Sequence, residues 1–92
     1  MLRGEEKVVM NFRKNLSNNV LYYRIENNLS QEALAEKMDS SVTYISEIEN
    51  QKRNVRIDYI EKLAKVLNIE LKELFTERDN VESKRIKRRK KI

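Results

Sequence analysis

Residues 29–50, LSQEALAEKMDSSVTYISEIEN, decide the fold, because two short helical patterns meet there at a tight turn. Apolar side chains recur within each half at intervals of three or four residues, which is the spacing of one helix face. The first half carries Leu34 and Met38, and the second carries Ile45 and Ile48. Both faces can pack on one core, so the pattern predicts two helices that cross through a short turn.

Each of these two helices has its own start signal. Ser30 and Ser41 stand one residue before the apolar-periodic runs, where a serine hydroxyl can accept a hydrogen bond from an unpaired amide of the first turn. Ala35 is the one small residue on the inner face of the first helix, where a steeply crossing helix needs close backbone approach. We therefore expect one helix directly after Ser30 and a second helix over residues 42–49.

Three further helical segments flank this pair. Apolar residues at helical spacing predict a helix from residue 11 to about residue 27, and another from residue 57 to residue 67. A short fifth helix is expected from residue 71 to about residue 77. The stripe of the first helix consists of Phe12, Leu16, Val20 and Tyr23, and that of the fourth consists of Ile57, Ile60, Leu63, Ala64 and Leu67. The predicted fold is an all-α, compact five-helix domain.

Length and composition limit the class of protein. Ninety-two residues suffice for one small domain and are too few for a deep, walled cleft with its supporting shell. The chain contains no Cys and no His, which excludes disulfides, thiolate chemistry, zinc fingers and histidine acid–base catalysis. The first ten residues lack an apolar signal segment, and no run is long enough to span a bilayer. We expect a cytoplasmic protein.

Charge is unevenly distributed along the chain. The net charge is +5, but residues 84–91 contain seven of the 20 Lys and Arg residues, so residues 1–83 contain 13 basic against 15 acidic residues. Any affinity of the domain for a polyanion must therefore come from local placement of charge. We divide the chain into a lead-in at residues 1–10, a domain at residues 11–77 and a basic tail at residues 78–92, for which solvated disorder is the default.

These features together resemble the phage-repressor-like, or Cro/repressor-type, helix-turn-helix family, without a gap from about residue 16 to residue 75. The resemblance is carried by Leu29-Ser30-Gln31-Glu32, Leu34-Ala35, Tyr44-Ile45-Ser46, Ile48-Glu49-Asn50, Lys52-Arg53-Asn54 and Leu71-Lys72-Glu73-Leu74-Phe75. It implies a regulator of transcription that binds double-stranded DNA, with residues 42–49 as the recognition helix. Within the family, the chain looks most like the restriction–modification controller proteins.

The chain departs from the family pattern at its turns. Asp39, Gln51 and Asn68 stand where the family often has glycine. Asp and Asn tolerate the left-handed conformation at modest cost, whereas Gln51 is a less comfortable substitute. Ser40 stands where the family usually has an aliphatic residue, which predicts looser packing at the turn between the paired helices.

The resemblance implies a reading surface on the recognition helix, since side chains from its first turns reach base edges in the major groove. Val42 can touch a thymine methyl group, Thr43 and Ser46 can donate or accept, and Glu47 can accept from a cytosine amino group. The alternative for Glu47 is a carboxylate that points away from the DNA, because an unpaired acid near phosphates would cost affinity. The predicted base-reading residues are Val42, Thr43, Ser46 and Glu47.

Phosphate contacts are expected around this helix. Residues 50–56 form a polar, basic segment without a clear period, which is either an ordinary solvated turn or a phosphate clamp that follows the recognition helix. Gln31 stands at the start of the preceding helix, where its side chain and the adjacent amides can bind phosphate. The predicted phosphate-binding residues are Gln31, Tyr44, Asn50, Lys52, Arg53, Asn54 and Arg56.

Leu71, Leu74 and Phe75 give the fifth segment more apolar groups than one small core needs. In the resembled family this region often forms a two-fold dimer surface, which suits palindromic DNA. Simple closure of the core is the alternative. We therefore predict a homodimer through these three residues.

Two classes of function remain open. One is a homodimeric transcription regulator on a palindromic operator, and the other is a protein-interaction module, such as the antitoxin of a toxin–antitoxin pair, with secondary DNA binding. In family members that activate, an acidic face of the second helix touches RNA polymerase, and Glu32 and Glu36 are available for that contact. No nucleophile, metal-ligand cluster or glycine-rich phosphate loop accompanies the carboxylates, so we expect no enzyme activity, cofactor or metal.

Overall fold

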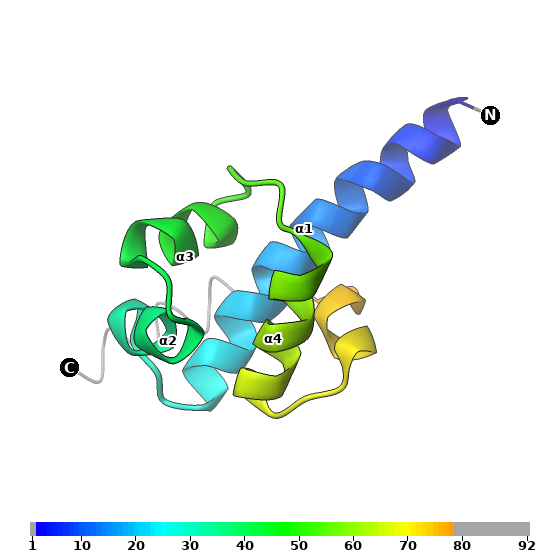
Figure 1. Cartoon of the computed structure of the whole chain (residues 1–92). Helices are drawn as coiled ribbons and strands as arrows, with labels where there is room; N and C mark the ends of the chain where they lie inside the picture. The colour runs from blue at the N-terminus through cyan, green and yellow to red at the C-terminus, as the bar shows by residue number, and fades with distance from the viewer. Residues whose placement is uncertain (1, 79–92) are drawn as a thin grey trace, which may run out of the picture.

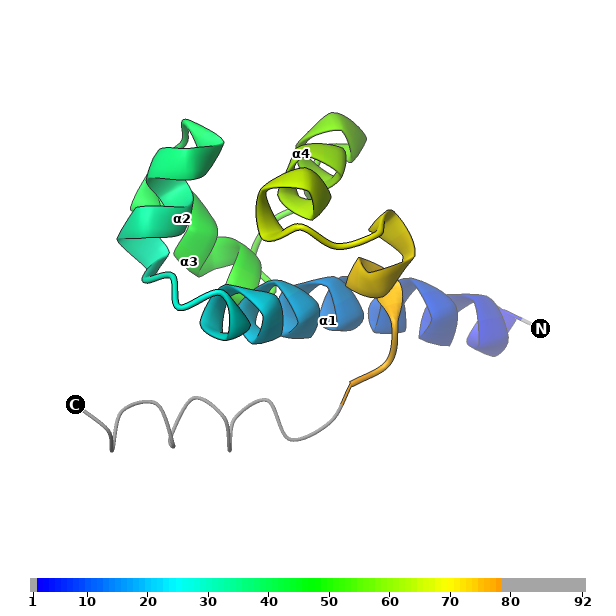
Figure 2. The ribbon, with the colours of Figure 1, turned by 90° about the horizontal axis from the view of Figure 1, so that it is seen from below.

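The computed structural model describes the chain over residues 2–78, with side chains from residue 12 onward. Its elements are α1 (Leu2–Glu26), α2 (Gln31–Met38), α3 (Val42–Glu49), α4 (Ile57–Leu67) and a short 3-10 helix, η1 (Leu71–Phe75). The long α1 lies across the molecule, and the other elements pack along one side of it (Figure 1, Figure 2). These described residues form helices and turns and no strand.

The helix-turn-helix pair has the expected caps. The Ser30 hydroxyl accepts from the Ala33 amide at 3.0 Å, and the Ser41 hydroxyl accepts from the Tyr44 amide at 3.1 Å. Asp39 ends α2 in the left-handed conformation with φ of 55°, which lets the chain turn sharply into α3. The predicted start of α2 after Ser30 and the predicted bounds of α3 are confirmed.

One hydrophobic core joins all five elements. It takes Leu16 and Val20 from α1 and Leu74 from η1, and the inner faces of α2, α3 and α4 supply the rest. The core side chains from α2, α3 and α4 are Leu34, Ala35, Met38, Ile45, Ile48, Ile60, Leu63, Ala64 and Leu67. The core therefore sets the position of α3 relative to α1 and α4.

The fifth helix was predicted wrongly in type and length. The structure has four α-helices, and the fifth segment is a five-residue 3-10 helix that ends at Phe75. The Asn19 amide donates to the carbonyl of Leu74 at 3.0 Å and to that of Thr76 at 2.6 Å. Because a side chain already satisfies the Leu74 carbonyl, the segment does not need to continue as an α-helix to pair it.

The first helix begins earlier than expected. Residues 2–10, predicted as a lead-in, form the first turns of α1, so the helix does not begin at residue 11. Two members of the predicted stripes are also exposed, because they lie where their helices leave the core: Phe12 is 49% exposed and Ile57 is 74% exposed. Of the predicted basic tail, only Arg78 falls within the described residues.

Candidate nucleic-acid interface

The outer face of α3 carries the four predicted base-reading residues. Figure 1 shows α3 on the outside of the bundle. Val42 and Thr43 are exposed in its first turn, and Ser46 and Glu47 are half-buried one turn later. The opposite face of the same helix carries the fully buried Ile45 and Ile48. The core thus orients α3 so that its first turn can approach a groove.

Glu47 and Arg53 form an ion pair. The Arg53 Nε lies 2.6 Å from the Glu47 Oε1, and the side chains are 49% and 34% exposed. The Arg53 guanidinium also lies over the Tyr44 ring, with its Cζ 5.1 Å from the ring centroid. Tyr44 in turn packs edge-on against Tyr59 of α4. A predicted base reader and two predicted phosphate binders are therefore one connected cluster.

The segment after α3 keeps several polar side chains at the surface. Lys52 is exposed, and no hydrogen bond or ion pair of its side chain is found within the described part of the chain. Arg56 is exposed and lies 3.4 Å from the Asp58 carboxylate. The Asn54 side-chain oxygen accepts a hydrogen bond from Arg13 of α1, a contact that the sequence analysis did not foresee. These residues are free to meet a polyanion at modest cost, since surface ion pairs are weak.

The N-terminal end of α2 is tied to α3 and α1 through a buried carboxylate. The Gln31 amide donates to Glu49 at 2.9 Å, and Arg24 of α1 makes two hydrogen bonds to the same carboxylate at 2.6 and 3.1 Å. The Glu49 side chain is fully buried. Gln31 therefore has a structural partner, although an amide nitrogen carries two hydrogens and can donate a second bond. The sequence analysis assigned no role to Arg24 or Glu49. One signal was available for Glu49: it stands on the same side of α3 as the buried Ile45 and Ile48.

Two short polar contacts hold the ends of α3. The Asn50 amide donates back to the Ser46 carbonyl at 2.8 Å and closes the C-terminal end of the helix. The Ser40 hydroxyl lies 2.8 Å from the Tyr59 hydroxyl, so the turn before α3 is bonded to α4. The looser packing predicted for Ser40 is compensated by this bond. Burial raises the pKa of Tyr59 above its ordinary value.

The three predicted dimer residues are divided between core and surface. Leu74 is fully buried in the chain's own core, whereas Leu71 is 41% exposed. Phe75 is half-buried and stacks on Phe12 of α1, with ring centroids 4.5 Å apart. The structure therefore assigns Leu74 to closure of the core and leaves Leu71, Phe75 and Phe12 at the surface.

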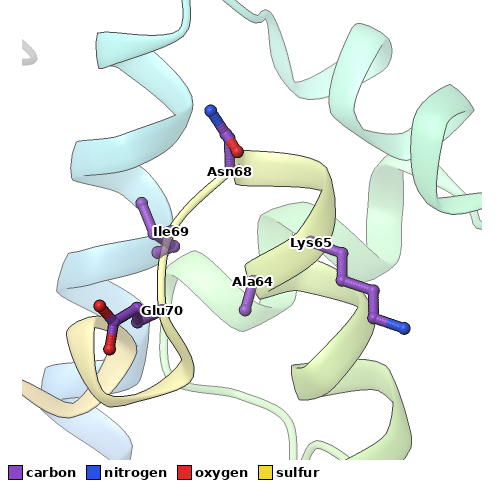
Figure 3. A pocket seen from close by; sticks show the side chains of 5 residues that line it. All are labelled: Ala64, Lys65, Asn68, Ile69 and Glu70. Carbon is purple, nitrogen blue, oxygen red and sulfur yellow. The ribbon is translucent and has the colours of Figure 1, made fainter.

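Other features of the described residues point to no further chemistry. A hollow at the C-terminal end of α4 is lined by five residues from the single segment 64–70, and its Lys65 and Glu70 side chains point in different directions (Figure 3). Over the described part of the chain, no group of three or more acidic residues could hold a metal ion. None of the helices searched in that part is both long and apolar enough to cross a membrane.

The sequence also has recognisable relatives. The pattern of the helix-turn-helix family matches residues 20–74. Control protein C.BamHI from Bacillus amyloliquefaciens is 47% identical over 62 residues, which cover 65% of this chain and 76% of that protein. Control protein C.SmaI from Serratia marcescens is 43% identical over 67 residues, which cover 73% of this chain and 80% of that protein.

Solved structures show the same fold. The hypothetical transcription factor NHTF from Neisseria superposes with a TM-score of 0.72 at 28% identity, covering 85% of this chain and 83% of that one. The restriction-modification controller protein C.AhdI from Aeromonas hydrophila superposes with a TM-score of 0.65 at 35% identity, covering 68% of this chain and 96% of that one. Since the family pattern spans more than half of the sequence and includes both α2 and α3, the chain belongs to the helix-turn-helix family and is a DNA-binding transcription regulator.

Proposed function

We propose that this protein binds a palindromic operator in double-stranded DNA as a homodimer, with α3 in the major groove. The observation that carries the proposal is the orientation of α3. Its first turn exposes Val42 and Thr43, while Ile45 and Ile48 anchor the opposite face in the core. A major groove admits one helix, and the first turns of that helix reach base edges.

The base-reading residues in this proposal are those of the exposed side of α3. Val42 contacts a thymine methyl group, and Thr43 and Ser46 exchange hydrogen bonds with base edges. Glu47 accepts from a cytosine amino group, while its bond to Arg53 offsets the repulsion that an unpaired carboxylate would meet beside phosphates. Together they define one half-site.

Phosphate contacts surround this reading surface. Lys52, Arg53 and Arg56 are exposed along the segment that leaves α3, and Gln31 begins α2 on the other side of the turn. Tyr44, Asn50 and Asn54 complete the set. Contacts of this kind position a protein on DNA without reading its sequence.

The proposed dimer surface is built on η1. Leu71 and Phe75 remain at the surface there, and Phe12 extends the patch onto α1. A two-fold dimer presents two copies of α3, so the operator half-sites are expected about 34 Å apart, one turn of DNA.

The regulated genes are proposed from the relatives. Two sequence relatives are named control proteins, and C.AhdI is a restriction-modification controller protein. We infer that this chain controls transcription of a restriction–modification system. Glu32 and Glu36 are exposed on α2 and form the acidic face proposed to touch RNA polymerase where regulation is activating.

The test compares Thr43→Ala with Lys52→Ala in competition binding against a library of randomised half-sites. Loss of a base contact should reduce discrimination at one position by about 1–3 kcal/mol. Loss of a phosphate contact should weaken all sequences and lower the magnitude of the slope of log affinity against log salt by roughly one unit. Lys65→Ala, on the far part of α4, is the control with the same charge change.

An unchanged base preference in Thr43→Ala would show that the first turn of α3 is not the reading surface. If the slope of log affinity against log salt is the same for Lys52→Ala as for Lys65→Ala, Lys52 does not contact a phosphate, and the segment after α3 loses its support as a phosphate-binding site.

A further inference from the structure

Arg13 joins α1 to the segment that follows α3. Its Nη2 donates a hydrogen bond to the side-chain oxygen of Asn54, and Figure 1 shows this segment passing from α3 to α4 beside α1. Both residues are exposed, although they are 41 residues apart in the sequence. The contact therefore brings a cation of α1 to the edge of the surface proposed to bind phosphates.

The same contact fixes which way the Asn54 amide faces. A guanidinium donates hydrogen bonds and accepts none, so the amide turns its oxygen toward Arg13 and its nitrogen away. Among the described residues, no acceptor for the Asn54 side-chain nitrogen is found. The N–H groups of this amide are thus available to an acceptor from another molecule.

Most donors of Arg13 are also unused. An arginine guanidinium has N–H donors on each of its nitrogens, and only Nη2 has an acceptor within the part of the chain that the structure describes. No carboxylate in that part forms an ion pair with Arg13, whereas Arg53 and Arg56 each lie beside one. Arg13 can therefore bind an anion without first leaving a carboxylate of the described chain.

We propose that Arg13 is a further phosphate-binding residue, and that its guanidinium and the Asn54 amide together hold one phosphate of the operator. The inference rests on the proposed binding of α3 in the major groove, and it adds a contact from outside the family match at residues 20–74. Phosphate oxygens accept several hydrogen bonds, so a charged donor and a neutral donor side by side can bind the same group.

The surroundings of the pair favour a DNA phosphate over an acidic protein. Asn54 follows Lys52 and Arg53 in the exposed segment that leaves α3, and α3 carries the proposed base-reading residues. Backbone phosphates flank every base pair that a helix can read in the groove. Donors beside the reading helix therefore meet a phosphate whatever the base sequence.

Contacts of α1 place this phosphate relative to the dimer. Phe12, the preceding residue, stacks on Phe75 in the proposed dimer patch, whereas Arg13 reaches the segment after α3. In a two-fold dimer such a patch adjoins the symmetry axis. The phosphate bound by Arg13 is therefore expected on the side of each half-site that faces the centre of the operator.

Salt dependence tests the contact with a matched control. Arg13→Ala and Lys14→Ala each remove one cation from an exposed position of α1, and no hydrogen bond or ion pair of the Lys14 side chain is found among the described residues. Arg13→Ala should lower the magnitude of the slope of log affinity against log salt by roughly 0.9 for each subunit bound, on operator and random DNA alike. Lys14→Ala should keep the wild-type slope, and Arg13→Lys should keep most of it.

Neutral methylphosphonate linkages locate the contact in an operator selected from the library of randomised half-sites. Replacing the phosphate that Arg13 binds should weaken the wild type at least about tenfold, because a hydrogen bond to a charged group is lost. Arg13→Ala should be insensitive to the same replacement. If this shared linkage lies on the outer side of the half-site, the place given to Arg13 in the complex is wrong.

The outcomes separate this inference from the proposed function. Equal slopes for Arg13→Ala and Lys14→Ala, with a wild type that still selects an operator, would overturn the contact and leave the proposed function intact. Loss of affinity in Arg13→Ala without a change of slope would also overturn it, because Arg13 would then only hold Asn54 in place. A wild type that selects no sequence from the half-site library would overturn the proposed function itself.

Discussion

The ion pair between Glu47 and Arg53 links two residues that have different proposed roles. Considered separately, the carboxylate is proposed to read a base and the guanidinium to bind a phosphate. In the structure they are 2.6 Å apart, and Arg53 also covers Tyr44. Replacing either residue therefore releases the other, so single substitutions cannot separate base reading from phosphate binding at this pair.

A double-mutant cycle is expected to reveal this coupling. Glu47→Ala, Arg53→Ala and the double variant should give operator-binding free energies that depart from additivity by about 0.5–3 kcal/mol. Fluorescence anisotropy at one salt concentration measures the operator affinity of the wild type, the two single variants and the double variant. The control cycle pairs Glu47→Ala with Lys52→Ala and should be additive within about 0.5 kcal/mol. If both cycles are additive, Glu47 and Arg53 do not interact in the complex, which would mean that their ion pair breaks when DNA binds.

Tyr59 should make stability depend on pH in the alkaline range. Burial raises the pKa of Tyr59 above the ordinary value of 10.0; the hydrogen bond with Ser40 acts in the opposite direction, and the neighbouring Tyr44 adds to the increase. The folded state then holds the proton more tightly than the unfolded state, so this contribution is full below pH 10 and is lost as the pH rises through the folded pKa.

The measurement is urea unfolding of the wild type and Tyr59→Phe between pH 8 and about pH 11. The wild type should lose free energy of unfolding more steeply than the variant above pH 10. Parallel curves would show that Tyr59 does not titrate differently in the two states.

At the scale of elements, the weak helix formers of α1 serve as anchors for the segment that follows α4. The Asn19 side chain is fully buried, donates to the carbonyls of Leu74 and Thr76, and accepts from Arg78 Nε at 2.6 Å. The Arg78 guanidinium also lies 3.9 Å from the centroid of the Tyr22 ring. Side-chain bonds to another element thus compensate for the poor helix propensity of residues 17–19.

Asn19→Ala should loosen η1 and lower the free energy of unfolding by about 1–3 kcal/mol, because buried carbonyls lose their donor. Asn18→Ala is the matched control, since Asn18 is half-buried and makes one long bond of 3.5 Å to the Arg78 carbonyl. Its effect should stay within about 0.5 kcal/mol. Urea unfolding measures both variants. Equal losses would show that the buried hydrogen bonds of Asn19 stabilise the fold no more than the single long bond of Asn18.

At the scale of the whole molecule, charge is divided between the domain and the C-terminal residues. Residues 84–91, with seven Lys or Arg, lie outside the described residues, whereas residues 1–83 carry a slight acidic excess. We propose that the exposed Lys52, Arg53 and Arg56, which follow α3 in the chain, provide the domain's own attraction to DNA.

Truncation after Ser83 should weaken binding to operator and random DNA equally, since Lys and Arg side chains neutralise phosphates, which are present in every DNA sequence. The magnitude of the slope of log affinity against log salt should fall by roughly 0.9 for each cation that contacts a phosphate. Salt titrations with both DNA types measure this effect. Selective loss of operator binding would show instead that the tail reads sequence.

The sequence by itself determined the local structure of this protein. Ser30 and Ser41 start the paired helices, the apolar stripe of residues 57–67 predicts α4, and Asp39 and Asn68 adopt the left-handed turns expected of them. These features depend on hydrogen bonds and side-chain spacing within a few residues, so neighbours in the chain suffice to specify them. The bounds of α3 along the chain follow from the same local signals.

The tertiary structure alone decided which side chains meet across the bundle. Arg24 and Glu49 are 25 residues apart, and Asn19 and Leu74 are 55 apart, so no local pattern connects them. Spacing also cannot tell the buried Leu74 from the exposed Leu71 in a segment of five residues, because burial there depends on how η1 packs against α1. Contacts of this kind follow from the angles and distances at which helices pack, which the whole core sets at once.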